Sequence, residues 1–279
     1  MLKLVPSTAV YSLLLPEVKE ILTEQIHEFY IHPANGHKLE TFLKTTITTF
    51  RDWVKDIVEL SEFPYAYPIN GVTGGIDQWM LDNLSNISLL SGEYGWPKVQ
   101  RPWIGDNTIP IKAAYISNPF SATGSFHQLH KNIELPTFLD CAFVGSTMKK
   151  KINITENVKI IAFSLSKGFG VNLFRTGFLF SKDKIPALET WLHYNYHNMV
   201  SISVARRIID TFPVDYTYNR FRDTQLEICR EYDLNPSDCV FLATSEDPKY
   251  KKYKREDGTY RLCLSREYAD RGLGTFEFK

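Results

Sequence analysis

The amino-acid sequence predicts an α/β protein in which a mostly parallel sheet is flanked by helices and followed by a smaller α+β lobe. The first observation is a series of short apolar runs, rich in β-branched residues, between residues 87 and 181. These runs do not alternate between apolar and polar residues, which is typical of strands covered on both faces. Helical periodicity on either side of this region is the second observation, and two late strand-like runs are the third.

The first element that we predict is a helix over residues 38–60, because its apolar residues recur at spacings of three and four. A glycine-rich turn, "GVTGG" at 71–75, then opens a second helix. Its small residues leave backbone N–H groups free at the positive end of that helix, so the turn is a candidate phosphate site.

Five predicted strands follow, and chemically interesting residues lie at or near their ends. The strands are "ISLLS" at 87–91, "IKAAYIS" at 111–117, "TFLDCAF" at 137–143, "VKIIAFS" at 158–164 and "GFLFS" at 177–181. Asn118 and Asp140 end two of them, Lys167 follows the fourth, and Arg175 precedes the fifth. Ligands of open α/β sheets bind at the carboxyl ends of strands, so we expect these side chains to converge on one crevice.

The C-terminal part of the chain predicts a different layout. Residues 185–232 are helical and more charged, and strands are expected at 239–245 and 260–265 on either side of a charged loop at 246–258. The basic stretch "KKYKRE" in that loop is followed by acidic residues, which favours a solvated loop. We therefore divide the chain into a large domain, 31–200, and a small domain, 201–279, with 1–30 packing near the small domain.

Composition excludes some classes of protein. Lys plus Arg and Asp plus Glu number 32 each in 279 residues, so we expect neither a nucleic-acid nor an anionic-membrane partner. No apolar run reaches membrane-spanning length, and the N-terminus is interpreted as mature protein and not as a signal peptide. The four cysteines lack metal-ligand spacing, which favours free thiols in a reducing cytosol, a cytoplasmic location and no metal site.

Lys167 is the most unusual residue of the sequence, because an amine at the end of a buried strand needs a reason to be there. A phosphate-binding turn, a buried carboxylate, a buried amine and an arginine would all be used by a phosphorylated cofactor with a cationic ring nitrogen and an aldehyde. The spacing Ser164-x-x-Lys167 also occurs in penicillin-recognising acyl-transfer enzymes, but their Ser-Asp-Asn and Lys-Thr-Gly motifs are absent.

The motif Ser164-Leu-Ser166-Lys167, with Arg175-Thr-Gly177 eight residues after the lysine, resembles the signature of fold-type I pyridoxal-phosphate enzymes. The resemblance is to the class I/II aminotransferases related to aspartate aminotransferase. "NGVTGGI", "EYGWP", "NP…TG", "D-x-A-aromatic" and "YRLCLS" resemble further family segments in the same order, from about residue 30 to 265. The chain is shorter than typical members, so it resembles a shortened member.

The resemblance implies a role for each matched residue. Lys167 would form a Schiff base with pyridoxal 5'-phosphate, and Asp140 would hold the protonated ring nitrogen. Asn118 would bond the ring's phenolate oxygen, and Tyr94 would stack on the ring. Arg261 would pair with the substrate's α-carboxylate. Phosphate ligands would be Thr73, Gly74, Ser164, Ser166 and Arg175, and Tyr30 would reach the phosphate of a neighbouring subunit, which implies a homodimer.

The function that the resemblance implies is an aminotransferase of amino-acid metabolism, which moves an amino group between an α-amino acid and a 2-oxo acid. Two alternatives stay open. One is another pyridoxal-phosphate reaction, in a lyase, decarboxylase or racemase, and the other is a catalytically reduced partner subunit that binds the cofactor. Taken singly, Asp140 is also consistent with a strand-end cap, Tyr94 with ordinary packing and Arg261 with an ordinary edge-strand arginine.

One residue departs from the family pattern. Position 143 is Phe, where the family usually has a Tyr whose hydroxyl donates to the cofactor's phenolate oxygen. Without that hydrogen bond we expect the cofactor's Schiff base to keep its proton to a higher pH.

Overall fold

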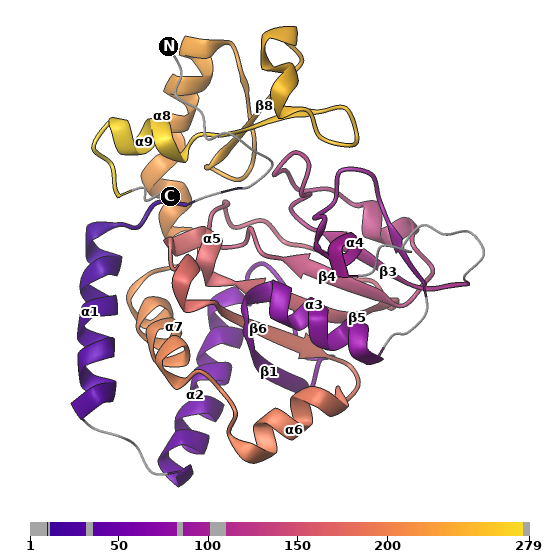
Figure 1. Ribbon diagram of the computed structural model, residues 1–279, viewed down its shortest axis with the longest axis vertical. Coiled ribbons are helices and arrows are strands. Elements are labelled where there is room, and N and C mark those ends of the chain that lie inside the picture. The colour runs from indigo at the N-terminus through magenta and orange to yellow at the C-terminus, as the bar shows by residue number, and fades with distance from the viewer. Residues whose placement is uncertain (1–9, 11, 32–35, 83–85, 101–109, 276–279) are drawn as a thin grey trace.

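The computed structural model describes residues 10, 12–31, 36–82, 86–100 and 110–275 (Figure 1). Within these residues one sheet has six strands in the order β1-β6-β5-β4-β3-β2. The strands are β1 Tyr65–Asn70, β2 Asn86–Leu89, β3 Ile111–Ser117, β4 Thr137–Cys141, β5 Val158–Ser164 and β6 Thr176–Ser181. Strands β2 to β5 pair in parallel, and β6 pairs antiparallel with both β1 and β5. The predicted mostly parallel sheet is therefore confirmed.

Strand β1 is one of the elements that were not predicted from the sequence. Its sequence "YAYPIN" contains Pro68, which has no backbone N–H to donate. An interior strand pairs with a neighbour on each side, so proline is unfavourable there. The strand lies at the edge of the sheet, where only β6 pairs with it, so the missing N–H is tolerated. It ends at Asn70, directly before Gly71 opens helix α3 (Gly71–Asp82), and this connection carries the predicted phosphate turn.

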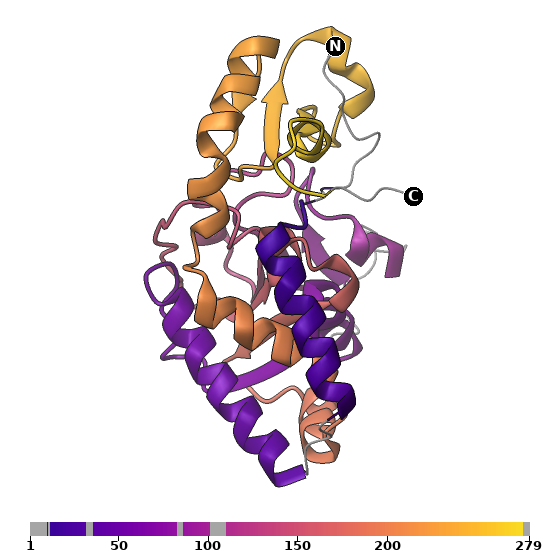
Figure 2. The ribbon, with the colours of Figure 1, turned by 90° about the vertical axis from the view of Figure 1, so that its left-hand side faces the viewer.

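Helices cover both faces of the sheet. Helices α1 (Pro16–Ile31), α2 (Gly36–Val54) and α7 (Met199–Thr211) lie side by side in Figure 2, with α7 between the other two. Helix α3 packs on the opposite face against β1, β5 and β6, together with α6 (Pro186–Tyr194). Successive residues of β6 alternate between the two cores: Phe178 and Phe180 belong to one and Leu179 to the other. This burial on both faces explains why the strands read as continuous apolar runs.

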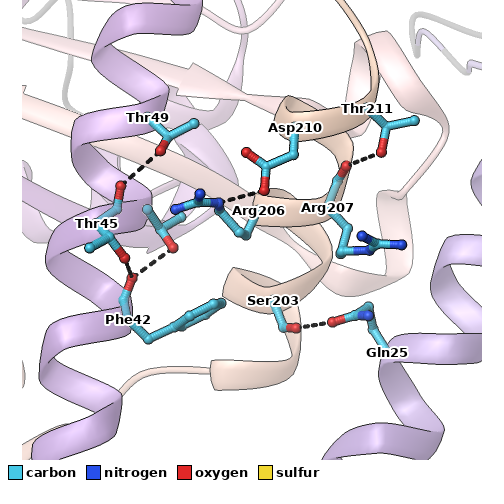
Figure 3. A network of polar contacts seen from close by, with 10 residues as sticks. Gln25, Phe42, Thr45, Thr49, Ser203, Arg206, Arg207, Asp210 and Thr211 are labelled. Atoms are coloured by element: carbon cyan, nitrogen blue, oxygen red, sulfur yellow. Dashed lines mark hydrogen bonds and ion pairs between the residues drawn. The ribbon is translucent and has the colours of Figure 1, made fainter.

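Aromatic packing and a few polar contacts fix the helical layer on the sheet. The ring of Phe50 on α2 lies 5.4 Å from that of Phe163 and 4.5 Å from that of Phe178. Between α7 and α1 the hydroxyl of Ser203 donates to the side chain of Gln25 (Figure 3). These contacts place the helices without using any of the residues predicted to carry chemistry.

The C-terminal part forms a smaller lobe at one end of the long axis (Figure 1). A three-stranded sheet in the order β7-β8-β9 packs with α8 and α9. Its elements are α8 Tyr216–Tyr232, β7 Asn235–Pro236, β8 Leu242–Ser245, η3 Pro248–Tyr253, β9 Tyr260–Cys263 and α9 Ser265–Asp270. Strand β8 is shorter than predicted, because residues 239–241 form a turn in which the amide of Leu242 bonds to the carbonyl of Cys239 at 3.0 Å.

The boundary between the two predicted domains stays a prediction. Helix α7 follows the predicted boundary at residue 200 almost immediately, yet it packs on α1, α2 and β6 of the larger part. Helix α8 contacts β7 in the small lobe.

The ends of neighbouring strands place the predicted residues at one edge of the large sheet. Ser117 at the end of β3 pairs with Asp140 on β4, and Asp140 pairs with Ala162 on β5. Ser164, the last residue of β5, pairs with Gly177 at the start of β6. The remaining short helices are α4 Trp96–Gln100, α5 Leu165–Phe169, η1 Leu129–Asn132 and η2 Asn172–Phe174. Helix α5 begins at this edge. Arg175 directly before β6 and the turn at Gly71 directly after β1 lie at the same edge, since Asn70 pairs with Thr176.

Candidate active site

A pocket with a volume of about 560 Å³ lies between this edge of the sheet and the small lobe. Strand-end residues line one side, and residues 254–256 and 261 of the small lobe line the other. Eight of the predicted site residues line it: Thr73, Tyr94, Asp140, Ser164, Ser166, Lys167, Arg175 and Arg261. Residues from six separate segments of the chain are thus brought to one cavity.

Lys167 lies on α5, the short helix that follows β5. Ser164 is the N-cap of this helix, and its hydroxyl accepts the amide of Ser166 at 3.2 Å. Gly170 ends the helix with a φ of 72°, a left-handed conformation that suits glycine. Burial lowers the pKa of Lys167 to about 8, and the positive charges of Arg261 and Arg175 act in the same direction. A substantial fraction of the amine is therefore neutral near physiological pH, as a nucleophile or base requires.

The segment that precedes α1 lies over α5. The backbone carbonyl of Val10 accepts a hydrogen bond from the Lys167 amine, and the hydroxyl of Ser12 donates to the carbonyl of Ser166 at 2.7 Å. A Cβ at Gly170 would lie 2.3 Å from the carbonyl oxygen of Leu13, so glycine is required for this close approach. Neither periodicity nor a motif in the sequence indicates this contact.

Asp140 is a buried carboxylate with two hydrogen-bond donors. The hydroxyl of Tyr115 on β3 donates to it at 2.6 Å, and the amide of Ala142 donates at 2.7 Å. Burial nevertheless raises the pKa of Asp140 to about 6, against the opposite effect of these two donors. A cationic partner would favour its charged form. Tyr115 was missed in the sequence, although a phenol in an otherwise apolar strand needs a buried partner.

On the same side of the pocket, Thr73, Ser166 and Arg175 present donors suited to an anion, and Gly74 beside Thr73 does not line the pocket. Thr73 and Gly74 lie in the first turn of α3, whose first four amides have no partner within the helix and which contains no acidic residue there. The guanidinium of Arg175 packs so closely on Gly71 that a Cβ at Gly71 would lie 3.0 Å from its Nη2. The hydroxyl of Ser166 is buried and has no hydrogen-bond partner within the described part of the chain.

Glu93 is a pocket residue that the sequence analysis did not single out. Its carboxyl accepts the amide of Ser117 at 2.8 Å and also the hydroxyl of Ser117. That hydroxyl in turn accepts the amide of Ser121 at 2.7 Å. Burial raises the pKa of Glu93 to about 8, so the carboxyl is largely protonated at neutral pH. Its position beside Tyr94 in "EYGWP" was the available signal.

Arg261 reaches the pocket from β9 in the small lobe. Its side chain is 5% exposed and donates to the backbone carbonyl of Ser121. Burial lowers the pKa of Arg261 to about 9, and the neighbouring charge of Arg255 contributes. Arg255 itself donates to the carbonyls of Gly92 and Glu93 at 3.2 and 3.3 Å. Two guanidinium groups thus approach the strand ends from the lobe.

Three of the predicted residues have other positions or surroundings. Asn118 does not line the pocket, because its side-chain amide donates to the carbonyl of His127 at 3.1 Å and its oxygen accepts the amide of His127 at 3.4 Å. Ser121 lines the pocket at that strand end instead. Tyr94 lies at the rim, and its hydroxyl is 3.5 Å from that of Thr73. Tyr30 falls in the last turn of α1, where its side chain lies outside the described residues.

Within the described ranges no group of three or more His, Cys, Asp or Glu side chains could hold a metal ion. No helix of the described part is long and apolar enough to cross a membrane. All four cysteines are buried free thiols.

No protein-family model and no curated protein matches the sequence. Solved structures do match. A pyridoxal-phosphate-bound C-S lyase from Staphylococcus hominis is 14% identical, with 95% of this chain and 88% of that chain covered and a TM-score of 0.64. A histidinol-phosphate aminotransferase from Sinorhizobium meliloti, in complex with pyridoxal-5'-phosphate, is 13% identical, with 95% and 88% covered and a TM-score of 0.66.

An L-threonine-O-3-phosphate decarboxylase from Porphyromonas gingivalis is 16% identical, with 97% of this chain and 96% of that chain covered and a TM-score of 0.61. The names of these three proteins describe different reactions, and each protein has low sequence identity to this chain. The likeness therefore shows the fold alone. The chain has the α/β fold of these enzymes, with a mostly parallel central sheet flanked by helices and a smaller second sheet.

Proposed function

We propose that the chain is a pyridoxal-phosphate-dependent enzyme that acts on an α-amino acid, and that its reaction is transamination with a 2-oxo acid. One observation carries the proposal: a buried lysine amine, a buried carboxylate and an anion-binding end converge on a single pocket. The fold that the chain shares with the solved enzymes supports it. The amino acid and the 2-oxo acid would be its small-molecule partners.

The residues present fit the cofactor. The buried Ser166 hydroxyl has no partner among the described residues, and a phosphate oxygen would supply one. Arg175 offers a planar fork that matches phosphate, and the first turn of α3 adds backbone N–H groups and the hydroxyl of Thr73. Asp140 lines the same pocket and would hold the ring nitrogen.

When bound, the cofactor supplies an electron-accepting ring that stabilises negative charge at the substrate's Cα. The buried Asp140 carboxylate would keep a proton on the ring nitrogen, because a positive charge on that nitrogen and the negative charge of the carboxylate favour each other. Lys167 would attach the cofactor through its amine and, once displaced by substrate, accept the proton from Cα. Its lowered pKa, to about 8, suits both tasks.

Arg261 would bind the α-carboxylate of the substrate. Its guanidinium is buried and anchored to the carbonyl of Ser121, so its orientation is set before substrate binds. A carboxylate suits such a desolvated cation, since a bidentate pair restores hydrogen bonds that the guanidinium loses with water.

Two alternatives keep the same site. The solved neighbours include a C-S lyase and a decarboxylase, so elimination or decarboxylation is the second candidate reaction. A cofactor-binding subunit without turnover is the third candidate. The homodimer with shared sites, the contact of Tyr30 with the partner's phosphate, the shortened architecture and the cytoplasmic location stay predictions from the sequence.

The experiment is a visible spectrum of the purified protein with pyridoxal phosphate, before and after a panel of amino acids. We expect a yellow protein whose absorbance changes with at least one amino acid. Product analysis with an added 2-oxo acid then separates the reactions: transamination gives a new amino acid, whereas a lyase or decarboxylase gives products without an acceptor. A yellow protein that responds to no amino acid would contradict the proposal and favour a non-catalytic subunit.

A further inference from the structure

A series of hydrogen bonds leads from the carboxyl of Glu93 to the guanidinium of Arg261. Glu93 is buried in the loop between β2 and α4 and lines the pocket. Its two oxygens accept the amide and the hydroxyl of Ser117 at the end of β3. The Ser117 hydroxyl accepts the amide of Ser121 at 2.7 Å, and the carbonyl of Ser121 accepts Nη1 of Arg261. The group proposed to bind the substrate's α-carboxylate is thus connected to a carboxyl on another loop.

The segment that carries Ser121 has no regular secondary structure of its own. Strand β3 ends at Ser117, and residues 118–128, all of them described, contain no helix or strand. Buried backbone groups in such a segment need partners outside a helix or a sheet. The hydroxyl of Ser117 is the partner of the Ser121 amide, so the position of this hydroxyl helps to determine where the Ser121 carbonyl points.

Glu93 is itself held in place by its surroundings. Its amide bonds to the carbonyl of Leu90 at 3.2 Å, and its carbonyl accepts Nη2 of Arg255 at 3.3 Å. Gly92, the preceding residue, lies against the segment after β3, since a Cβ at Gly92 would be 2.8 Å from the Cβ of Ala122. The loop that contains Glu93 and the segment that contains Ser121 are therefore packed together as well as hydrogen-bonded.

The protonation of Glu93 suits a role in orientation. Burial raises its pKa to about 8, so the carboxyl is largely neutral at neutral pH. A neutral carboxyl still accepts and donates hydrogen bonds, but it adds little negative charge to the pocket that would receive the substrate's carboxylate. Glutamine, which is neutral and has the same shape, should therefore be able to replace it.

We infer that Glu93 is a positioning residue for amino-acid binding: its carboxyl holds Ser117, and through Ser117 it holds the carbonyl of Ser121 that orients the guanidinium of Arg261. This inference rests on the proposed function, in which Arg261 binds the α-carboxylate. Because Glu93 acts through Arg261, its removal should have no further effect on amino-acid binding in a protein that lacks Arg261.

The test begins with an amino acid that changes the absorbance of the wild-type protein with bound pyridoxal phosphate. Its Kd and that of pyridoxal phosphate are measured for Glu93→Ala and Glu93→Gln. Glu93→Ala should weaken amino-acid binding about tenfold and cofactor binding less than about threefold. Glu93→Gln should stay within about twofold of wild type, because its side-chain oxygen accepts the Ser117 amide and its NH₂ donates to the Ser117 hydroxyl.

A second variant and a control accompany these. Glu93→Ala leaves the amide of Ser117 without its acceptor, so Ser117→Ala is included. It keeps that contact with the carboxyl, removes the acceptor of the Ser121 amide, and should weaken amino-acid binding about three- to tenfold. Glu267→Ala is the control, because it removes a buried glutamate that bonds to Arg271 at 3.2 Å and does not line the pocket. It should keep both Kd values of wild type.

A double-mutant cycle tests the route through Arg261. The double variant Glu93→Ala/Arg261→Ala should bind the amino acid as weakly as Arg261→Ala alone, within about twofold. Losses that multiply in the double variant would show that Glu93 does not act through Arg261.

The outcomes separate this inference from the proposed function. If Glu93→Gln weakens amino-acid binding as much as Glu93→Ala, or if Ser117→Ala binds as wild type, the inference is wrong and the proposed function stands. The same holds if Glu93→Ala lowers cofactor and amino-acid affinity equally. If Arg261→Ala binds the amino acid as wild type does, the role of Arg261 fails and this inference fails with it. If no amino acid changes the absorbance of the wild-type protein, the proposed function itself fails.

Discussion

The two sides of the pocket are built in different ways. On the sheet side, Asp140 lies near the end of β4, and Lys167 and Arg175 lie in the connection between β5 and β6, so their positions follow from strand order and register. On the lobe side, Arg261 contacts a carbonyl 140 residues away, and Arg255 one 163 residues away. Regular sheet topology therefore positions the residues on the proposed cofactor side, whereas contacts between distant segments position those on the proposed substrate side.

The largest effect is expected on the sheet side, from Lys167→Ala. Without the amine the protein should lose covalent attachment of pyridoxal phosphate and all turnover, although the phosphate-binding groups remain. The matched control is Lys159→Ala, on the preceding strand but outside the pocket lining. For both variants, visible absorbance measures cofactor attachment and an activity assay measures turnover. A Lys167→Ala protein that still forms a covalent cofactor complex would show that Lys167 does not attach the cofactor.

The second effect, from Arg261→Ala, should be confined to the lobe side. Removing one member of a buried guanidinium–carboxylate pair typically costs roughly 2–5 kcal/mol, so amino-acid binding should weaken by that amount. Cofactor affinity should change little, because the proposed cofactor ligands lie on the sheet side, whereas Arg261 belongs to β9 of the small lobe. Arg266→Ala, exposed on α9, is the control. Equal losses of cofactor and amino-acid affinity in titrations would indicate a structural role for β9.

The third prediction concerns stability, through Glu93 on the loop between the two sides. Its pKa is about 8 in the fold and 4.5 ordinarily, so the folded state keeps a proton that the unfolded chain releases in this window. The free energy of unfolding should therefore fall as pH rises from about 4.5 to 8, and Glu93→Gln should remove roughly 2–4 kcal/mol of that fall. Asp140 acts in the same direction but is present in both proteins.

Urea unfolding of both proteins without cofactor, at pH 5 and pH 8.5, measures this difference. The same dependence on pH in wild type and Glu93→Gln would show that the Glu93 carboxyl is already charged in the fold.

The smallest effect is expected from Phe143→Tyr, within the sheet side. Phe143 lines the pocket three residues after Asp140. A hydroxyl there should donate to the cofactor's phenolate oxygen and lower the pH midpoint of the visible absorbance by about 1–2 pH units, if the bond is worth about 1.5–3 kcal/mol. Phe143→Leu, which adds no donor, should keep the midpoint. Coincident midpoints for the Tyr variant and wild type would show that this side chain does not face the oxygen.

The sequence predicted the fold class and eight of the residues that line the pocket, largely for one physical reason. Buried parallel strands read as apolar runs, and polar residues at their carboxyl ends must meet at one edge. Asp140 and Lys167 follow this rule. Arg175 reaches the same edge because β6, which it precedes, runs antiparallel to β5, and all three residues line the pocket. Strand β1 was not predicted, because Pro68 is tolerated only at the edge of a sheet and a single sequence does not reveal which strand lies at the edge.

The rest depended on contacts that no local pattern encodes. Asn118 ends a strand as predicted, but its side chain bonds to His127 nine residues later. Glu93 is largely protonated because it is buried, against the opposite effect of the two donors that Ser117, at the end of β3, supplies. Arg255 was interpreted as part of a solvated loop, because hydrophilic runs usually lie in such loops. The hairpin into β9 places it at the cavity.

The central claim is that Lys167 is the residue to which the cofactor is attached. The most direct test is borohydride reduction of the wild-type protein incubated with pyridoxal phosphate, followed by protease digestion and mass mapping. We predict a single stoichiometric adduct on the peptide that contains Lys167, because this amine is buried in the pocket with a pKa lowered to about 8. An adduct on a different lysine, or no adduct at all, would contradict the account.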